Sequence, residues 1–418
     1  MPKIPREMSP DSTLALLADP YHFMSRRCRK HGTDLFEARI LLQRTICMVG
    51  RDAAKLIYDA DRFMRKGAFP IRGQKTLVGV GSVQNLDDDE HRDRKRMLMS
   101  LMTPARLAAL GKGFDGMLDA QAILWTTADR VVLYDAMREV LTRTVCAWAG
   151  VPLPEADVAK RTEQLTRMFD WAGRIGPKHW ASRRARGQAE QWIGSLVRQV
   201  RLGQLDVPAD SALGVITRHP DPHGGLLPAR IAAVEVINIL RPTVAVAVFI
   251  ADIAHALKTH PLSRERLAGG DERYRGWFVH EVRRFYPFFP FTTARVRETF
   301  EWNGYQFPKG RRVMLDLHGT NRDPRVWDKP DTFNPDRFAT WDADPFGLIP
   351  QGGGDHDAGH RCAGEWITID LMKRATDFLA RRIAYDVPRQ DLRLAWTRLP
   401  ALPNSKMVLA GVRAHAAS

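Results

Sequence analysis

The chain has 418 residues, of which 44% are hydrophobic, so it can bury a large core in one or two domains. Lys and Arg exceed Asp and Glu by 15, yet no nucleic-acid-binding motif accompanies this charge, so a solvated basic surface or attraction for anionic ligands explains it better than nucleic-acid binding. Four widely spaced cysteines argue against a disulfide framework and against a structural zinc cluster.

The beginning of the chain predicts two strands and a helix. Residues 1–20 contain scattered charges and no apolar stretch like that of a signal peptide or anchor, so we expect a cytoplasmic protein. Residues 35–42 and 45–49 have the pattern of short strands around a turn, and residues 52–58 begin a helix.

The middle of the chain predicts several consecutive helices. Apolar residues recur at helical spacing from about residue 104 to residue 201, with breaks at Gly150-Val151-Pro152 and at Gly176-Pro177. The basic run at residues 183–186 is expected to be solvated.

The second half predicts one long helix and then mixed structure. The long helix spans about residues 228–260, with Pro228 in its first turn. A segment rich in Pro, Gly and Asp follows Pro324, a helical pattern resumes over residues 365–383, and residues 407–412 resemble a strand.

The long helix has an unusual centre. Residues 236–251 are apolar except around Arg241, and a buried guanidinium needs an anion nearby because an unpaired buried charge is costly. Glu235 faces another side of the helix, which leaves a distant protein carboxylate, a bound carboxylate or phosphate, or escape of Arg241 to the surface. Pro242 removes a backbone donor and is expected to distort the helix. The apolar stretches beside Arg241 are too short for a membrane span.

One cysteine follows a glycine-rich loop at the start of a helix. Residues 350–365 read PQGGGDHDAGHRCAGE, which places Cys362 where backbone N–H groups stabilise a thiolate and glycines admit a flat cofactor. A metal-bound thiolate fits this pattern. A zinc site with His356 and His360, which lacks a fourth ligand, and a cysteine nucleophile are less favoured alternatives.

The motifs of the second half resemble those of the cytochromes P450, and the resemblance extends over nearly the whole chain. Residues 281–284 (Glu-Val-Arg-Arg) are similar to the family's Glu-x-x-Arg motif, and residues 362–364 (Cys-Ala-Gly) to its Cys-x-Gly signature. Between them the family's pattern continues at Asn321, Arg322, Asp323, Pro324, Trp327, Pro330, Phe333, Pro335, Arg337 and Phe338. The long glycine-rich loop, with Leu348 in its aromatic region, and Arg241-Pro242 in place of an acid and an alcohol resemble the bacterial fatty-acid peroxygenases.

This resemblance implies a fold and a cofactor. The fold would be mainly α with small β-sheets, the cytochrome P450 fold, in a single domain over residues 1–418. The cofactor would be haem b, with Cys362 as the axial thiolate ligand of the iron. His91, Lys95 and Arg65 would be directed at the haem propionates, although each also suits a solvated basic surface.

The resemblance also implies a substrate and a reaction. The chain would be a hydrogen-peroxide-dependent fatty-acid hydroxylase in which Arg241, with Pro242 beside it, holds the substrate carboxylate as an acid–base group. Oxidation is expected mainly at the alpha carbon, which gives a 2-hydroxy fatty acid, with beta-hydroxylation or minor decarboxylation as further outcomes. Gln84 disfavours decarboxylation, and the small Val78 favours the alpha carbon. The other pocket-wall residues would be Phe288 and Phe289.

Further residues have implied supporting roles. Glu281, Arg284 and Arg337 would form a buried ionic network that supports the haem-binding core. The fatty-acid tail would lie near residues 168–171 and the turn at Gly176-Pro177, although these aromatics equally suit a simple core.

The expected partners are a medium- or long-chain fatty acid and hydrogen peroxide, with no obligatory redox partner, no nucleic acid and no membrane span. Three alternatives remain at this stage. They are a reductase-dependent P450 monooxygenase, a decarboxylase that makes terminal alkenes, and a non-catalytic haem or fatty-acid binder.

Overall fold

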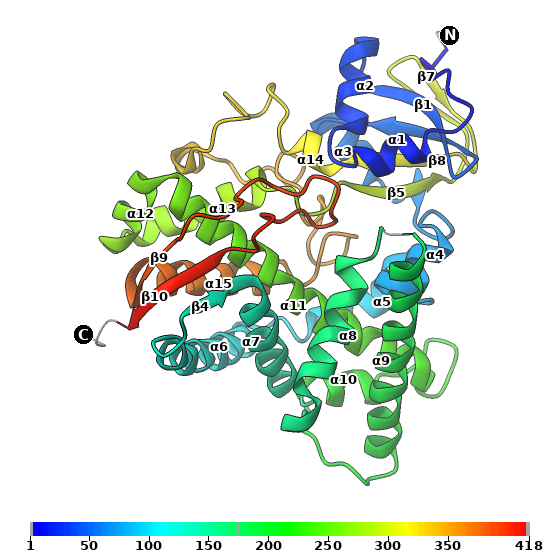
Figure 1. Cartoon of the computed structure of the whole chain (residues 1–418). Helices are drawn as coiled ribbons and strands as arrows, with labels where there is room; N and C mark the ends of the chain where they lie inside the picture. Colours follow the sequence, from blue (N-terminus) through cyan, green and yellow to red (C-terminus); the bar gives the residue numbers. More distant parts are fainter. Residues whose placement is uncertain (1–2, 174, 415–418) are drawn as a thin grey trace.

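The central element of the fold is α11 (Ala229–Thr259), which runs through the middle of the molecule (Figure 1). The computed structural model describes residues 3–173 and 175–414. Because α11 is apolar on all sides, it is buried on all sides, and 94% of its most hydrophobic stretch is enclosed by protein. This apolar helix is therefore the core of the fold.

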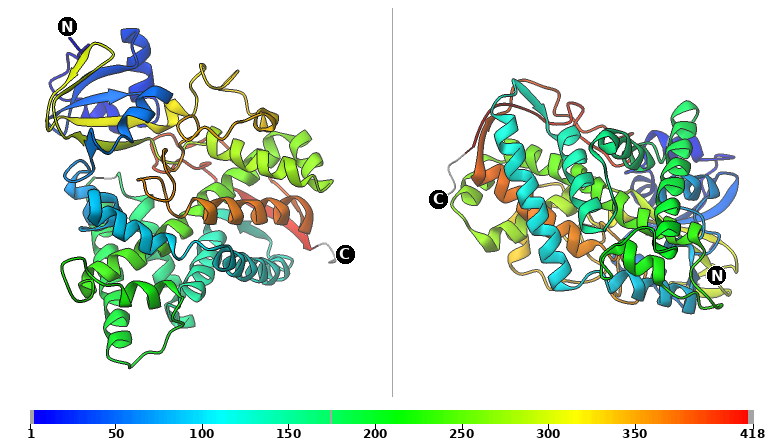
Figure 2. Two further views of the ribbon diagram at one scale, coloured as in Figure 1. Left: turned by 180° about the vertical axis from the view of Figure 1, so that it is seen from behind. Right: turned by 90° about the horizontal axis from the view of Figure 1, so that it is seen from below.

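Of the four predicted consecutive helices, the last three pack against α11 and the first packs against the second. They are α6 (Pro104–Trp125), α7 (Leu133–Trp148), α8 (Val158–Asp170) and α9 (Pro177–Arg201). Figures 1 and 2 show α7, α8 and α9 beside α11. Both predicted helix breaks are confirmed, whereas Pro228 is the residue that caps α11 rather than part of its first turn.

The other helices and helical turns have at most 14 residues, and α15 is among those that also pack against α11. They are α1 (Thr13–Ala18), α2 (Phe23–His31), α3 (Arg51–Ile57), α4 (Ile71–Gly73), η1 (Gln74–Val78), η2 (Val83–Asn85), α5 (Asp88–Met99), η3 (Glu155–Asp157), α10 (Ala212–Arg218), α12 (Pro261–Ala268), α13 (Glu272–Phe285), α14 (Leu317–Thr320), η4 (Pro335–Ala339), α15 (Glu365–Asp377) and η5 (Phe378–Arg382).

A five-stranded sheet forms one corner of the molecule (Figure 2). Its strand order is β1 (Leu35–Ile40), β2 (Gln43–Met48), β8 (Arg312–Asp316), β5 (Phe291–Val296) and β3 (Phe63–Met64). The two predicted strands form the β1–β2 hairpin, but its turn lies at residues 41–42 rather than at residues 43–44, with Ile40 opposite Gln43 at its tip. The mainly α fold with small sheets is likewise confirmed.

Two smaller sheets complete the fold. One has the order β4 (Arg130–Val132), β10 (Val408–Ala414) and β9 (Ile383–Asp386), and the other pairs β6 (Phe300–Trp302) with β7 (Tyr305–Phe307). The helix predicted over residues 365–383 ends earlier, at Asp377, and a π-helical turn follows it. Ile383 belongs to β9 because Ile383 and Ala384 pair with β10, and this pairing replaces the last helical turn.

Candidate active site

Arg241 lies in the middle of α11 and is a buried cation without a counter-ion. Its side chain is 5% exposed, its Nε has no hydrogen-bond partner, and no carboxylate in the described part of the chain pairs with it. Burial, together with the positive charge of Arg186, lowers the pKa of Arg241 to about 9, while Cys362 acts in the opposite direction. The guanidinium is therefore charged at neutral pH and is poised to bind an anion.

The nearest acid along α11 is fully committed to other groups. Glu235 accepts a hydrogen bond from Arg94 Nη1 at 2.8 Å, from the Val83 N–H at 2.8 Å and from Asn238 Nδ2 at 3.2 Å. The helix continues through Pro242, whose missing N–H leaves the Asn238 carbonyl without its usual helical donor. The expected distortion thus stays local and does not interrupt α11.

A second buried guanidinium, which the sequence analysis missed, lies near the first. Arg186 belongs to the basic run that was expected to be solvated, but it is 2% exposed. Its Nε donates to Glu190 at 2.7 Å, and its terminal nitrogens donate to the carbonyls of Leu77 and Val78 at 3.1 and 3.4 Å. The pairing of Arg186 with Glu190 four residues later was the available signal.

Two of the predicted pocket residues contact these buried groups. Val78 ends η1 and is buried, and Arg186 holds its carbonyl against α9. Gln84 lies on η2 with an exposed side chain, and its Oε1 accepts a hydrogen bond from Asn238 Nδ2 at 3.4 Å. Asn238 lies one helical turn before Arg241, so Gln84 is within reach of the same part of α11.

The two predicted phenylalanines meet α11 further along. Phe288 stacks on Phe249 with ring centroids 4.3 Å apart, and Phe289 meets Phe288 edge-on at 4.9 Å. Phe249 is eight residues beyond Arg241, about two turns along the helix. Met168 and Phe169, which were expected near the substrate tail, are fully buried in the main core.

Cys362 lies at the end of the glycine-rich loop, just before α15. Its N–H donates to the Gln351 carbonyl at 3.1 Å, and Gln351 Nε2 lies 3.9 Å from its Sγ. Burial and Glu365 raise the pKa of the Cys362 thiol, while the Gly364 N–H, Lys95 and Arg241 lower it. Because Arg241 and Cys362 each act on the other's pKa, the two side chains lie within electrostatic reach of each other.

The other cysteines differ from Cys362 in their surroundings. Cys28, Cys47 and Cys146 are buried in apolar clusters, and burial raises the pKa of each thiol. No group of three or more potential metal-ligating side chains occurs within residues 3–173 and 175–414, so the alternative zinc site with His356 and His360 is not formed.

The loop around Cys362 is held by ion pairs that the sequence analysis did not identify. Glu365, at the start of α15, pairs with both Arg283 and Arg361. Burial alone would raise the pKa of Glu365, but the two guanidinium groups hold this pKa at about 2. The carboxylate is therefore charged and fixes the loop against α13.

Three buried basic side chains lie near this loop. Lys95 Nζ donates to the Arg361 carbonyl at 2.5 Å, His91 lies against His360 with ring centroids 3.8 Å apart, and Arg65 Nη1 donates to the Thr293 carbonyl at 2.6 Å. None of the three pairs with a carboxylate among the described residues, and burial lowers the pKa of each, to about 4 for His91. They are not solvated charges.

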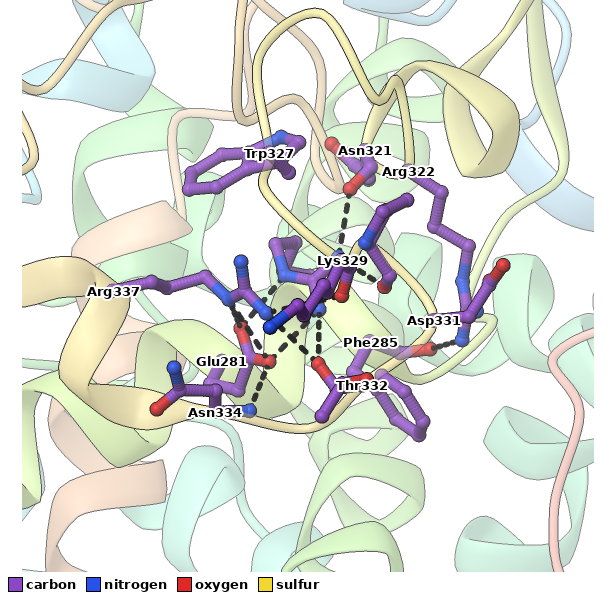
Figure 3. A network of polar contacts seen from close by, with 12 residues as sticks. Glu281, Phe285, Asn321, Arg322, Trp327, Lys329, Asp331, Thr332, Asn334 and Arg337 are labelled. Carbon is purple, nitrogen blue, oxygen red and sulfur yellow. Dashed lines mark hydrogen bonds and ion pairs between the residues drawn. The ribbon is translucent and has the colours of Figure 1, made fainter.

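A fully satisfied ionic network lies further from Cys362 (Figure 3). Glu281 pairs with Arg284 through Nε and Nη2 at 2.7 and 2.8 Å and with Arg337 Nε at 3.3 Å, and its carboxylate also accepts the Asn334 N–H at 2.7 Å. Arg284 Nη1 donates to the carbonyl of Pro330 at 2.9 Å. Glu281 and Arg284 are both completely buried.

Solved structures of one enzyme group match the whole chain. Cytochrome P450SP alpha (CYP152B1), solved with (R)-ibuprofen, is 48% identical and superposes with a TM-score of 0.95 over 97% of this chain and 99% of the other. The chain belongs to the cytochrome P450 family. Cytochrome P450EX alpha (CYP152N1) with myristic acid is 42% identical, and a P450 OleT variant with arachidonic acid is 32% identical. Both of these matches have a TM-score of 0.96 and cover 99% of each chain.

Sequence comparisons agree with this assignment. The family model for cytochrome P450 matches residues 273–375. Rhazimal synthase of Alstonia scholaris is 43% identical over 90 residues, but the match spans only 18% of that protein's length. Cytochrome P450-SOY of Streptomyces griseus is 27% identical over 331 residues, which are 78% of this chain and 71% of that protein. The family and the CYP152 branch that the sequence motifs predicted are confirmed.

The P450 cofactor is a haem held by a cysteine thiolate, and the residues of this P450 fit it. Cys362 is half-buried, and the Gly364 N–H, Lys95 and Arg241 favour its thiolate form. His91, Lys95 and Arg65 supply donors that lack protein carboxylates, as the anionic propionates require. On α11, the buried Arg241 Nε has no hydrogen-bond partner.

Proposed function

We propose that this P450 hydroxylates fatty acids with hydrogen peroxide, preferentially at the alpha carbon, with Cys362 as the iron ligand and Arg241 as the carboxylate anchor. The supporting observation is the buried Arg241 guanidinium, which pairs with no carboxylate among residues 3–173 and 175–414 and lies within electrostatic reach of Cys362. Relatives solved with myristic acid and arachidonic acid support a fatty-acid substrate.

The guanidinium selects and orients the substrate. A carboxylate can accept two parallel N–H bonds from the planar guanidinium, which fixes both the position and the orientation of the head group. Removal of water from this enclosed region strengthens the pair. A long-chain alcohol or hydrocarbon leaves the buried charge unpaired and therefore binds weakly.

The anchored carboxylate also supplies the acid–base group. The nearest acid on α11, Glu235, is occupied by Arg94, Asn238 and a backbone N–H, so it is not free to move a proton. The substrate carboxylate, held by Arg241, accepts a proton from hydrogen peroxide and returns it to the departing oxygen. The haem, when bound, supplies the oxidising chemistry through its thiolate ligand.

The same anchor decides which carbon reacts. With the head group fixed, the alpha and beta C–H bonds are the ones nearest to Cys362. Val78 and Gln84 are tied to α9 and α11 through Arg186 and Asn238, so they form a rigid wall near the first carbons. The small Val78 leaves room for the alpha carbon, and beta-hydroxylation and decarboxylation are the minor outcomes.

The test is turnover of myristic acid by the haem-loaded protein with hydrogen peroxide alone. We expect 2-hydroxymyristic acid as the main product. Arg241→Ala should keep its haem absorbance and lose turnover by about 100-fold or more, because binding and proton transfer both depend on the anchor. Arg184→Ala, an exposed arginine on α9, is the matched control and should behave as the wild type.

Other outcomes of this test identify the alternatives. Product that requires a reductant and redox proteins would favour a reductase-dependent monooxygenase. A terminal alkene as the main product would favour a decarboxylase, and binding without turnover would favour a non-catalytic binder. Unchanged turnover in Arg241→Ala would refute the anchor.

A further inference from the structure

A basic cavity that is wide open to solvent lies on the five-stranded sheet. Figures 1 and 2 show this sheet in one corner of the molecule. It has a volume of about 360 Å³ and is formed by β2, β5, β8 and the turn before β8. The cations that line it are Arg44, Arg295, Lys309, Arg311 and Arg312. Cys362 and Arg241 take no part in it.

Carboxylates neutralise only some of these cations. Glu37 pairs with Arg44 and with Arg311, and Glu298 pairs with Lys309 through an exposed contact of 2.6 Å. One carboxylate shared between two guanidinium groups leaves net positive charge, and the exposed lysine pair is weak in water.

The remaining two arginines contact neutral groups alone. Arg295 donates to two backbone carbonyls and to the Gln43 amide oxygen, while the buried Arg312 donates to the Thr45 hydroxyl and to one backbone carbonyl. The cavity therefore keeps unneutralised positive charge in a fixed geometry. A phosphate group is the anion that several guanidinium groups bind best.

An apolar hairpin tip adjoins the cavity. Leu41 and Leu42 form the two-residue turn between Ile40 and Gln43, with φ angles of 52° and 60°. Turns of this kind favour Asn and Gly, because other side chains are strained at positive φ. The two leucines are nevertheless 45% and 78% exposed, so neither backbone preference nor burial in the core explains them.

The N-terminal segment holds this tip in place and adds a third leucine. The Leu41 N–H donates to Thr13 Oγ1 and the Leu42 N–H donates to Asp11 Oδ2, both at 2.6 Å. Leu14, the next residue after Thr13, is 76% exposed. Three leucines are thus presented to solvent beside the basic cavity.

We propose that this corner binds the surface of a lipid bilayer that contains anionic phospholipid. Leu14, Leu41 and Leu42 enter the interfacial region, and the cavity binds a lipid phosphate. Exposed apolar side chains next to cations are the combination that interfacial binding requires, whereas a nucleic acid has no use for the leucines.

The sheet joins this surface to the proposed substrate pocket. Strand β5 begins at Phe291, directly after the pocket residues Phe288 and Phe289, and reaches Arg295 after four residues, about 14 Å. A bilayer is also where free fatty acids accumulate. The surface therefore suits the proposed function, but its binding to lipid does not depend on turnover.

The test is co-sedimentation of the haem-loaded full-length protein with phosphatidylcholine vesicles, with and without phosphatidylglycerol. We expect binding only when phosphatidylglycerol is present. The double variant Leu41→Asn/Leu42→Gly should weaken vesicle binding by more than about tenfold. It lacks the two apolar side chains whose transfer from water into the bilayer favours binding. This variant suits the turn, so its thermal stability should equal or exceed that of the wild type. Leu262→Asn, an exposed leucine on α12, is the matched control and should bind normally.

Further variants and ligands distinguish binding to a bilayer from binding to other anionic ligands. Arg44→Gln/Lys309→Gln should lower vesicle affinity by several-fold and make it less sensitive to salt. If inorganic phosphate or duplex DNA binds as tightly as the vesicles and the leucine variant behaves as the wild type, bilayer docking is wrong. Bilayer docking is also wrong if the wild type does not bind vesicles.

Turnover separates this proposal from the proposed function. All these variants should hydroxylate dispersed myristic acid at the wild-type rate. Vesicle binding without turnover would overturn the proposed function alone, and turnover without vesicle binding would overturn this inference alone.

Discussion

Two buried arginines of this P450 have opposite surroundings. Arg284 is completely buried, pairs with Glu281 through two nitrogens and donates to backbone carbonyls with the rest of its guanidinium. Arg241 is almost as buried, but it has no carboxylate partner in the described chain, and its Nε lacks any acceptor. The first has its counter-ion within the fold, and the second requires one from outside.

This difference separates a structural charge from a functional one. Breaking a satisfied buried pair strands a charge and destabilises the fold, whereas an unpaired buried charge already destabilises it. A fold that retains such a charge stores free energy that an incoming anion releases. The same residue type in one core can thus be a support in one place and a binding group in another.

The largest expected effect is on the satisfied network. Glu281→Gln leaves Arg284 and Arg337 without their carboxylate, and we expect a loss of about 3–5 kcal/mol in the free energy of unfolding. Denaturation with urea measures this loss, and haem retention should fall in parallel. Glu298→Gln, which removes a pair with Lys309 between two exposed side chains, is the control and should cost less than about 1 kcal/mol. Equal losses of stability in the two variants would show that the buried network supports the fold no more than an exposed ion pair does.

An intermediate effect is expected at Arg186. Arg186→Ala removes the donors to the carbonyls of Leu77 and Val78 and leaves Glu190 unpaired. We expect a loss of about 1–3 kcal/mol in stability, because buried acceptors lose their partners. The released Val78 turn should also shift the ratio of alpha to beta product, measured by chromatography. A stable variant with an unchanged ratio would show that Arg186 does not position this wall.

The smallest expected effect is a pH dependence of fatty-acid binding. Burial lowers the pKa of Arg241 to about 9, so the anchor is charged below this pH and loses its proton above it. The affinity for myristic acid should be constant from pH 7 to about 9 and then fall by about tenfold for each further pH unit. Substrate-induced changes in haem absorbance measure this, with a long-chain alcohol as a pH-independent control. An affinity that does not change up to pH 11 would contradict the lowered pKa.

The same shift sets the pH dependence of stability in the substrate-free protein. The unfolded chain keeps the Arg241 proton to a higher pH than the folded chain does. The contribution of Arg241 to stability therefore rises as the pH increases through about 9.

The sequence predicted the elements with strong periodicity and the groups whose surroundings are local. The apolar residues on both sides of Arg241 raised the question of a buried charge but left its escape to the surface open, whereas the glycines before Cys362 indicated the cysteine loop. Arg186 was missed because its exposed neighbours Arg183 and Arg184 make the run look solvated, although only one side of a helix faces solvent.

Contacts between distant segments could not be predicted from local patterns. Glu235 finds Arg94 across 141 residues, and Glu365 finds Arg283 across 82. Either acid could have been a counter-ion of Arg241 from its charge alone. Their actual pairing depends on how the helices pack, which single-sequence periodicity does not specify.

The most direct test of the central claim is the same substitution at the two buried arginines in substrate-free, haem-loaded protein. Arg241→Met removes an unpaired charge and should raise the free energy of unfolding by about 1–4 kcal/mol, while Arg284→Met should lower it by about 3–5 kcal/mol. Myristic acid should stabilise the wild type against unfolding and leave Arg241→Met unaffected. If Arg241→Met instead destabilised the protein as much as Arg284→Met does, Arg241 would have a counter-ion within the fold, and its role as the carboxylate anchor would be contradicted.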